Sequence, residues 1–231
     1  MVFDFSEAAG KAQSSSKPLL EGNKIHTVKF LGCERRTIQG KKDPNATYDV
    51  LEIKFENEKG TFTHTIWALT DESKYKDSIS PNGIKNPSEA TTVKYLFFHL
   101  LKAINPELSA KIESGEKKLP FKPGTPAEIW EQLCQVFIKA TESSKGKETQ
   151  IKLLMNKKGD AIFPYFLNYS KEGEIYMSTN FIGENLGFTA KEKTYISKMQ
   201  SAAPTKPSAS DGLAIDNTDN EAADESLNFD L

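Results

Sequence analysis

The sequence has little of what secreted, membrane-spanning and metal-binding proteins depend on. Its two cysteines, Cys33 and Cys134, lie far apart among 231 residues, which excludes a CxxC metal clip and a dense disulfide framework. No run approaches the roughly 18 consecutive apolar residues of a membrane span. The first 16 residues carry Asp4 and Glu7 without a long apolar stretch. We therefore expect a soluble cytoplasmic protein, with no membrane partner, in which both cysteines are buried free thiols.

The motifs of common catalytic sites are also absent. The sequence contains no GxxxxGK[ST], GxGxxG, GxSxG or HExxH motif. Histidines His26, His64 and His99 occur singly, which favours structural roles over a zinc site shared with the cysteines. Carboxylates are scattered, and the only dense group follows residue 201. We predict no catalytic residue, no metal and no cofactor, and keep a magnesium-dependent nuclease that uses scattered acids as an alternative.

The net charge of −2 hides an asymmetry between the body of the chain and its last segment. From residue 201 onward, seven acids face a single base, Lys206, which gives −6, whereas residues 17–200 carry +5. The last segment consists mainly of Ala, Ser, Pro, Asp and Asn, and lacks the apolar surface that a core needs. We predict a flexible leader over residues 1–18, a mildly basic domain over 19–190 and a disordered acidic tail over 201–231.

The first part of the domain has the period of antiparallel strands. Leu51, Ile53 and Phe55 alternate with more polar residues, and residues 56–60 supply the Asn and Gly of a hairpin turn. Three strands are therefore expected, at residues 24–33, 48–55 and 61–69.

Trp67 stands out on the third of these strands. Phe62 and Ile66 share one row, whereas Trp67 lies in the more polar row. Two interpretations follow: Trp67 is a half-exposed platform on which a base stacks, or it is covered by a helix or another sheet.

The middle of the chain changes to a helical period. Ser88 is a candidate N-cap for apolar residues that recur at spacings of three and four until Asn105-Pro106. A shorter helix is expected over residues 106–113. Thr125 and Glu128 form a capping box with proline at the first helical position, so a third helix is expected from there to residue 142. We treat residues 88–142 as one helical insertion.

After residue 146 the pattern returns to strands, which are expected at residues 149–156, 161–169 and 174–181, with the core ending near Phe188. This region interleaves aromatic residues with lysines, and so does the region around residues 29–54. Basic turns beside aromatic strands are what a groove needs in order to follow phosphates and stack bases, although aromatic residues are also ordinary strand formers. The candidate DNA-binding residues are Lys29, Arg35, Arg36, Lys41, Lys42, Tyr48, Lys54, Trp67, Lys152, Lys157, Lys158, Tyr165, Tyr169 and Tyr176.

The order of these elements limits the fold. The chain has three antiparallel strands, then a helical connection, then two or three further strands. This order corresponds to a mixed, mainly β fold: a five-stranded oligonucleotide-binding (OB) barrel with a large helical insertion between strands 3 and 4. The chain resembles bacteriophage single-stranded DNA-binding proteins of the OB fold. The segments that carry this resemblance are the strand block 24–69, the aromatic hairpin 149–177 and the acidic ending Asp224–Leu231. It departs from bacterial members, which end in Pro-Phe, because its own tip reads Phe-Asp-Leu.

The resemblance implies a non-enzymatic protein that binds and protects single-stranded DNA during phage-type replication, recombination or repair. The tail would then recruit replication or recombination proteins through Asp224, Glu225, Phe229, Asp230 and Leu231. An alternative of another class is a structural or adaptor protein whose barrel binds other proteins. The body charge of +5 is compatible with both functions.

Overall fold

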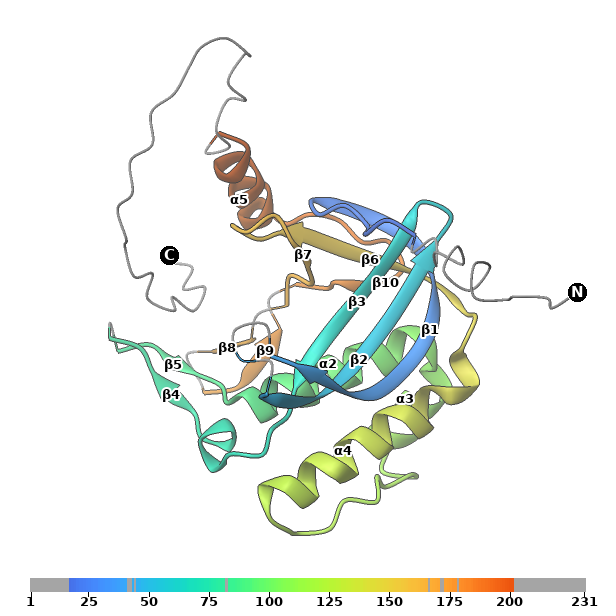
Figure 1. Cartoon of the computed structure of the whole chain (residues 1–231), viewed down its shortest axis with the longest axis vertical. Coiled ribbons are helices and arrows are strands. Elements are labelled where there is room, and N and C mark those ends of the chain that lie inside the picture. Colours follow the sequence, from blue (N-terminus) through green and yellow to red (C-terminus); the bar gives the residue numbers. More distant parts are fainter. Residues whose placement is uncertain are drawn as a thin grey trace, which may run out of the picture.

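A computed structural model describes residues 17–40, 43, 45–81, 83–165, 167–170, 173–177 and 179–201. These residues form a mainly β fold, in which an antiparallel five-stranded sheet curls into a half-barrel and four α-helices accompany it (Figure 1). The strand order is β10-β6-β1-β2-β3, and a short strand, β7 (Ala161–Ile162), also pairs with β6. The strands of the half-barrel are β1 (Lys24–Gln39), β2 (Thr47–Asn57), β3 (Gly60–Trp67), β6 (Glu148–Met155) and β10 (Ile182–Gly183).

Strand β1 changes its partner part-way along its length. Its first part, residues 24–29, pairs with β6, and residues 29–39 pair with β2. The register shifts between Phe30 and Gly32, and Gly32 has a φ of +124°. Glycine takes positive φ values readily, and a bulge bends its strand and increases the twist. The bulge therefore turns the sheet from β6 toward β2, which produces the curl.

The predicted inner face of β2 is confirmed. Leu51, Ile53 and Phe55 are fully buried, and they face β3 residues Phe62 and Ile66, which are also buried. Apolar residues at every second position of both strands supply this continuous face. This face forms one side of the hydrophobic core.

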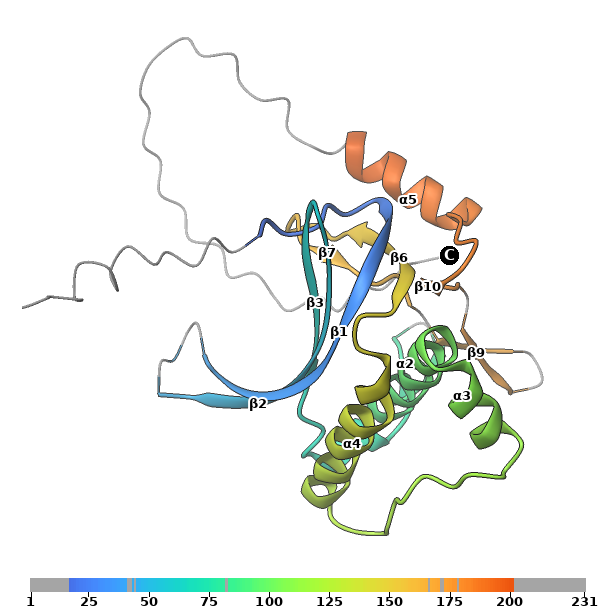
Figure 2. The ribbon, with the colours of Figure 1, turned by 90° about the vertical axis from the view of Figure 1, so that its right-hand side faces the viewer.

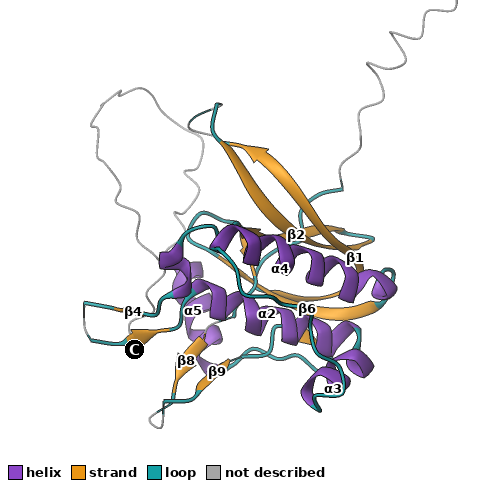
Figure 3. Cartoon of the chain, turned by 90° about the horizontal axis from the view of Figure 1, so that it is seen from below, coloured by secondary structure: helices purple, strands orange, loops and turns teal. Residues whose placement is uncertain are grey.

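The predicted helical region is confirmed between β3 and β6. It contains α2 (Glu89–Ile104), α3 (Pro106–Glu113) and α4 (Pro126–Thr141). Ser88 accepts a hydrogen bond from the Thr91 amide at the start of α2, and the capping box of Thr125 and Glu128 opens α4. Helices α2 and α4 lie on one side of the half-barrel, and the β1–β2 hairpin projects beyond them (Figure 2, Figure 3).

The expected continuous strand over residues 161–169 is wrong. The chain forms β7 and then β8 (Leu167–Tyr169), which pairs with β9 (Ile175–Met177) in a separate two-stranded sheet. Between them, Phe163 enters the core against Phe62 and Phe181, and Pro164 cannot donate to a strand ladder. Of the strand expected over residues 174–181, only β9 is formed.

Several elements were not predicted. A 3₁₀ turn, η1 (Glu72–Tyr75), leads into a small hairpin of β4 (Ser78–Ile79) and β5 (Lys85–Asn86), and a second 3₁₀ turn, η2 (Glu142–Ser144), follows α4. Helix α5 (Ala190–Ser201) follows the expected end of the core and contacts β6. Among the helices that the structure describes, none has the length and apolar character needed to cross a membrane.

Part of the prediction falls outside the described residues. This holds for residues 1–16 and 202–231, which contain most of the predicted leader and tail, and for loop residues 41 and 42. The predicted site residues in these parts are Lys41, Lys42, Asp224, Glu225, Phe229, Asp230 and Leu231.

Candidate nucleic-acid interface

The face of β2 and β3 that points away from the core presents two exposed aromatic rings. Trp67 is 53% exposed and Tyr48 is 46% exposed. Their ring centroids lie 5.6 Å apart with an interplanar angle of 86°, an edge-to-face contact that positions each ring beside the other. The interpretation of Trp67 as an exposed side chain is therefore confirmed; its contact with a base stays a prediction.

Strand pairing explains why the two rings meet. Val50 of β2 pairs in register with Trp67, and Tyr48 lies two residues before Val50, on the same face. Along β3 this face continues through Thr65, Thr63 and Thr61, whose side chains are half-buried or exposed. The face is therefore aromatic at the Trp67 end and hydroxyl-rich beyond it.

Two basic side chains of this face already have acidic partners. Lys54 contacts Glu34 and lies 3.1 Å from Glu52, and Arg36 lies 3.4 Å from the same Glu52 carboxylate. The hydrogen bond from Lys54 lowers the pKa of Glu34. A phosphate at this face would compete with these carboxylates for Lys54 and Arg36, so the electrostatic attraction of the face is small.

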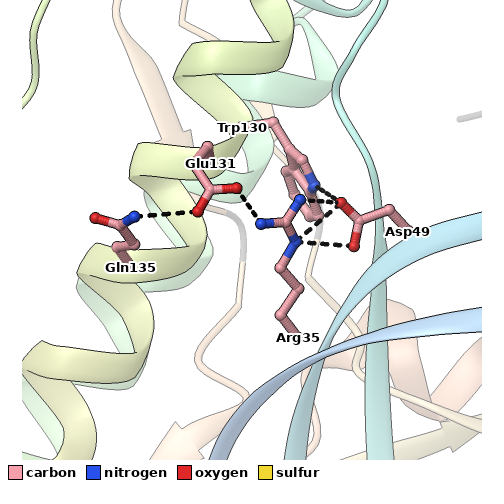
Figure 4. Close-up of polar contacts among 5 residues, drawn as sticks. All are labelled: Arg35, Asp49, Trp130, Glu131 and Gln135. Atoms are coloured by element: carbon pink, nitrogen blue, oxygen red, sulfur yellow. Dashed lines mark hydrogen bonds and ion pairs between the residues drawn. The ribbon is translucent and has the colours of Figure 1, made fainter.

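Arg35 points to the opposite side of the sheet and links the hairpin to α4 (Figure 4). Its Nε donates to Oδ1 of Asp49 at 3.0 Å, its Nη2 donates to Oδ2 at 2.6 Å, and its Nη1 contacts Glu131 of α4. Asp49 accepts a further hydrogen bond from the indole of Trp130 at 2.8 Å, and Gln135 donates to Glu131 at 3.0 Å. Two carboxylates satisfy the guanidinium, so the structure gives Arg35 a structural role in place of the predicted phosphate contact.

The hydrogen bonds from Arg35 hold the pKa of Asp49 below its usual range, and the Trp130 indole adds to this effect. The same contacts raise the pKa of Arg35. Both groups are therefore charged at neutral pH, and the β1–β2 hairpin is fixed to α4 by an ion pair.

An open hollow lies beside this link, where β1 and β2 approach the loop that joins them. Its volume is about 420 Å³, and its lining residues are Arg35, Arg36, Thr37, Thr47 and Asp49. The hollow is close in sequence to Tyr48 and to the loop that contains Lys41 and Lys42. Most of its lining lies on the side of the hairpin opposite the aromatic pair, and a polar ligand group can enter there.

Comparison of the chain with protein-family models, curated proteins and solved structures finds no match.

Lys152 is not at the surface. Its side chain is 1% exposed, and its ammonium donates to Thr179 at 2.6 Å, to the Gly187 carbonyl at 3.0 Å and to the Glu192 carboxylate at 2.9 Å. All three donors of the ammonium are used within the protein. The prediction that Lys152 contacts phosphate is wrong, because α5 covers the outer side of β6.

The other late candidates lie apart from the aromatic pair. Tyr165 packs on the core with its hydroxyl 3.1 Å from Nε2 of His64, and burial raises the pKa of Tyr165 to about 12. Tyr169 donates to Asp77 at 2.5 Å, and the Lys85 ammonium lies 4.4 Å from its ring centroid. These contacts make Tyr165 and Tyr169 parts of the fold, which does not support their predicted stacking role.

Four further candidates are exposed but separate. Tyr176 lies on β9, Lys157 and Lys158 lie in the turn after β6, and Lys29 lies on β1 opposite Glu56 and Glu148. No hydrogen bond, ion pair or ring contact among the described residues joins any of them to Tyr48 or Trp67. Of the described candidates, Arg36, Tyr48, Lys54 and Trp67 lie on one face, and Lys29, which pairs in register with Glu56, lies farther along the same face.

The histidines and cysteines take structural positions. Burial lowers the pKa of His64 to about 4, and Nε2 of His26 lies 2.8 Å from the Glu21 carbonyl oxygen. Cys33 and Cys134 are buried free thiols, as predicted, and burial raises the pKa of each to about 12. Within the described part of the chain, no group of three or more His, Cys, Asp or Glu side chains is arranged to hold a metal ion.

Proposed function

We propose that this chain is a non-enzymatic protein that binds single-stranded DNA on the outer face of β2 and β3. We also propose that the half-barrel is an OB barrel, in which β1, β2, β3, β6 and β10 are the five strands. Two features support this assignment: β1 lies between β2 and β6, and helices α2 to α4 are inserted between the third and fourth of these strands.

The observation that carries the proposal is the exposed pair of Tyr48 and Trp67 at one end of this face. OB barrels bind oligonucleotides through the face of strands 2 and 3 and through the adjoining loops. An exposed ring that is held in place offers a π-face to any base, and stacking contributes roughly 1–3 kcal/mol per base without sequence preference. The pair thus suits a ligand with unpaired bases.

The charges of the face support binding that depends more on stacking than on phosphate contacts. Arg36 and Lys54 have carboxylate partners, so few counterions are released when DNA binds. We expect a shallow dependence of affinity on salt, to which Lys41 and Lys42 contribute if their loop contacts phosphate. Recruitment of replication or recombination proteins by the acidic segment 201–231 is part of the same proposal, in phage-type DNA metabolism.

The same near-neutral face favours one alternative, an adaptor that binds another protein. Aromatic residues are enriched in the centres of protein interfaces, whereas lysines and acids are depleted there. The Tyr48–Trp67 pair with its neutralised surroundings fits that description as well.

Fluorescence separates the two functions, because the tryptophans differ in exposure. Trp130 is buried and Trp67 is exposed, so a ligand that stacks on the face changes the emission of Trp67 alone. Titration with an unstructured oligonucleotide should quench emission, whereas a duplex of equal length should not, and Trp67→Phe should abolish the quenching. Absence of quenching and of a mobility shift at micromolar protein in low salt would refute DNA binding. Cleavage of labelled DNA with magnesium would instead support the nuclease alternative.

A further inference from the structure

Several lysines of the helical insertion lack acidic partners among the described residues. Between α3 and the last turns of α4, several lysines form no ion pair or side-chain hydrogen bond among the described residues. By contrast, Lys54 and Arg36 on the sheet face have carboxylate partners. The lysines that we call the basic patch are Lys111, Lys117, Lys118, Lys122 and Lys139. Residues 106–141 also hold five glutamates, but none of them lines the groove between α3 and α4.

An apolar groove lies beside these lysines, between α3, α4 and the loop that connects them. Figure 2 shows the two helices and this loop. The volume of the groove is about 250 Å³, and the described residues that line it include two lysines and no acid. Apolar surface comes from Leu108, Leu119, Pro120, Val136 and Ala140, Lys117 and Lys139 contribute charge, and Gln132 and Gln135 complete the lining.

The wall of the groove is fixed by backbone contacts. The Lys122 amide donates to the Gln132 side chain at 2.6 Å, and the Gln132 amide donates back to the Lys122 carbonyl at 3.2 Å. These two bonds hold the loop against α4, so that the groove exists before a ligand binds. A preformed apolar groove between two lysines suits a peptide that combines acidic and large apolar side chains.

We propose that the acidic segment of the same chain, residues 219–231, docks in this groove. Phe229 and Leu231 occupy the apolar part, and the neighbouring carboxylates lie near Lys117 and Lys139. The segment and the groove are complementary in charge and in apolar content. Residues 201–231 carry a net charge of −6, and the last eight residues of the chain contain three large apolar side chains, Leu227, Phe229 and Leu231.

The length of the intervening chain allows this contact. Thirty residues follow Ser201, the last residue of α5. An extended chain spans up to about 3.3–3.6 Å per residue, so the segment reaches any part of the domain. Because the segment belongs to the same chain, its effective concentration at the groove reaches the order of mM, so that even a weak peptide contact is populated.

The inference does not depend on DNA binding, because the groove belongs to α3 and α4, whereas the proposed DNA face belongs to β2 and β3. Charge sets the rate of encounter and apolar burial sets the lifetime of the contact. The groove offers both, because Lys117 and Lys139 stand beside its apolar lining, whereas Arg36 and Lys54 on the sheet face are already paired.

A spin label on the full chain tests the proposal. Asn228→Cys can be labelled with a nitroxide while Cys33 and Cys134 are buried. In low salt, the label should cause loss of methyl signal at Leu108, Leu119 and Val136. The signal should return at 1 M salt, where the Debye length falls to about 3 Å.

Matched variants of the labelled chain separate charge from folding. Lys117→Glu with Lys139→Glu should restore the methyl signals, and Phe229→Ala with Leu231→Ala should do the same while every charge remains. Lys157→Glu with Lys158→Glu makes the same change in charge in the turn after β6 and should leave the signal loss intact. Lys117→Ala with Lys139→Ala should give a partial return, which covers the case in which charge reversal disturbs the helices.

Three outcomes would overturn the proposal. The first is loss of methyl signal that persists both in Lys117→Glu with Lys139→Glu and in Lys117→Ala with Lys139→Ala. The second is loss at Val50 on the sheet face in place of the groove. The third is equal loss when the spin label and the labelled methyl groups are on different molecules in a mixed sample, which would place the segment on a second copy. None of these outcomes affects the fluorescence test of DNA binding.

Discussion

The ammonium of Lys152 lies 2.9 Å from the carboxylate of Glu192, and this ion pair is buried between strand β6 and helix α5. The two side chains are 1% and 6% exposed. Thr179 donates to Glu192 at 2.9 Å, and the Thr189 amide donates at 2.7 Å, so the carboxylate is satisfied as fully as the ammonium. The network fixes α5, and with it the start of the acidic segment, on the outer side of the sheet.

Removal of one partner should destabilise the protein strongly. Lys152→Met leaves the Glu192 carboxylate buried without a cation, which costs about 3–5 kcal/mol when a buried pair is broken. The free energy of unfolding in urea measures this cost, and Lys157→Met, which changes an exposed lysine, is the control. Lys152→Met with Glu192→Met should recover part of the loss. Surface substitutions change the free energy of unfolding by up to about 0.5 kcal/mol. If Lys152→Met differs from wild type by no more than that, the pair is not buried in solution.

Lys152 also shows why part of the fold could not be predicted. A lysine in a strand indicates a surface position, but Ile151, Lys152, Leu153 and Leu154 are all buried, since elements pack on both faces of β6. The helix that covers Lys152 did have a local signal. Thr189 and Glu192 form a capping box, in which the Glu192 amide donates to Thr189 at 3.2 Å and the Thr189 amide donates to Glu192.

Predictions with short-range signals were confirmed. The caps at Ser88 and Thr125, and the alternation of Leu51, Ile53 and Phe55, each depend on neighbours within a few positions. The contact of Asp49 with Trp130 joins residues 81 positions apart and leaves no local pattern. For the same reason the sequence did not separate cations that have acidic partners, such as Arg35, from those that do not.

The link between Asp49 and Arg35 predicts a specific response to acid. Because Arg35 lowers the folded-state pKa of Asp49, the stability from this pair is present above the unfolded pKa of about 3.9 and is lost as the pH falls through the lower folded value. Asp49→Asn should therefore lower the free energy of unfolding at pH 7 and flatten its decrease in acid. Urea unfolding of both proteins between pH 7 and 2 measures the difference.

Asp160→Asn is the control for this experiment. Asp160 lies in the exposed turn after β6, where its carboxylate accepts a hydrogen bond from the Asn156 amide. Its loss should leave the acid dependence close to that of wild type. Parallel pH profiles for Asp49→Asn and wild type would contradict the role assigned to Arg35.

His64 should remain neutral across the physiological range. It lies among Phe163 and Tyr165, with ring centroids at 5.2 and 5.4 Å, and burial lowers its pKa to about 4. Its imidazole resonances in an NMR titration should therefore stay constant from pH 8 to well below 6. In urea the midpoint should return to about 6.5, the value of an exposed histidine. A midpoint near 6.5 in the folded protein would mean that the ring is open to water.

Trp67→Ala should weaken binding of single-stranded DNA while leaving the fold intact. Trp67 is 53% exposed, so its removal creates no cavity, and the loss should amount to roughly 1–3 kcal/mol per stacked base with little change in salt dependence. Phe121→Ala removes another exposed ring, 45% exposed on the loop after α3, and should leave DNA affinity unchanged. Fluorescence anisotropy with a labelled oligonucleotide at several salt concentrations, together with urea unfolding, separates the effects. If Trp67→Ala lowers stability as much as affinity, or if Phe121→Ala weakens binding equally, the aromatic pair is not the stacking site.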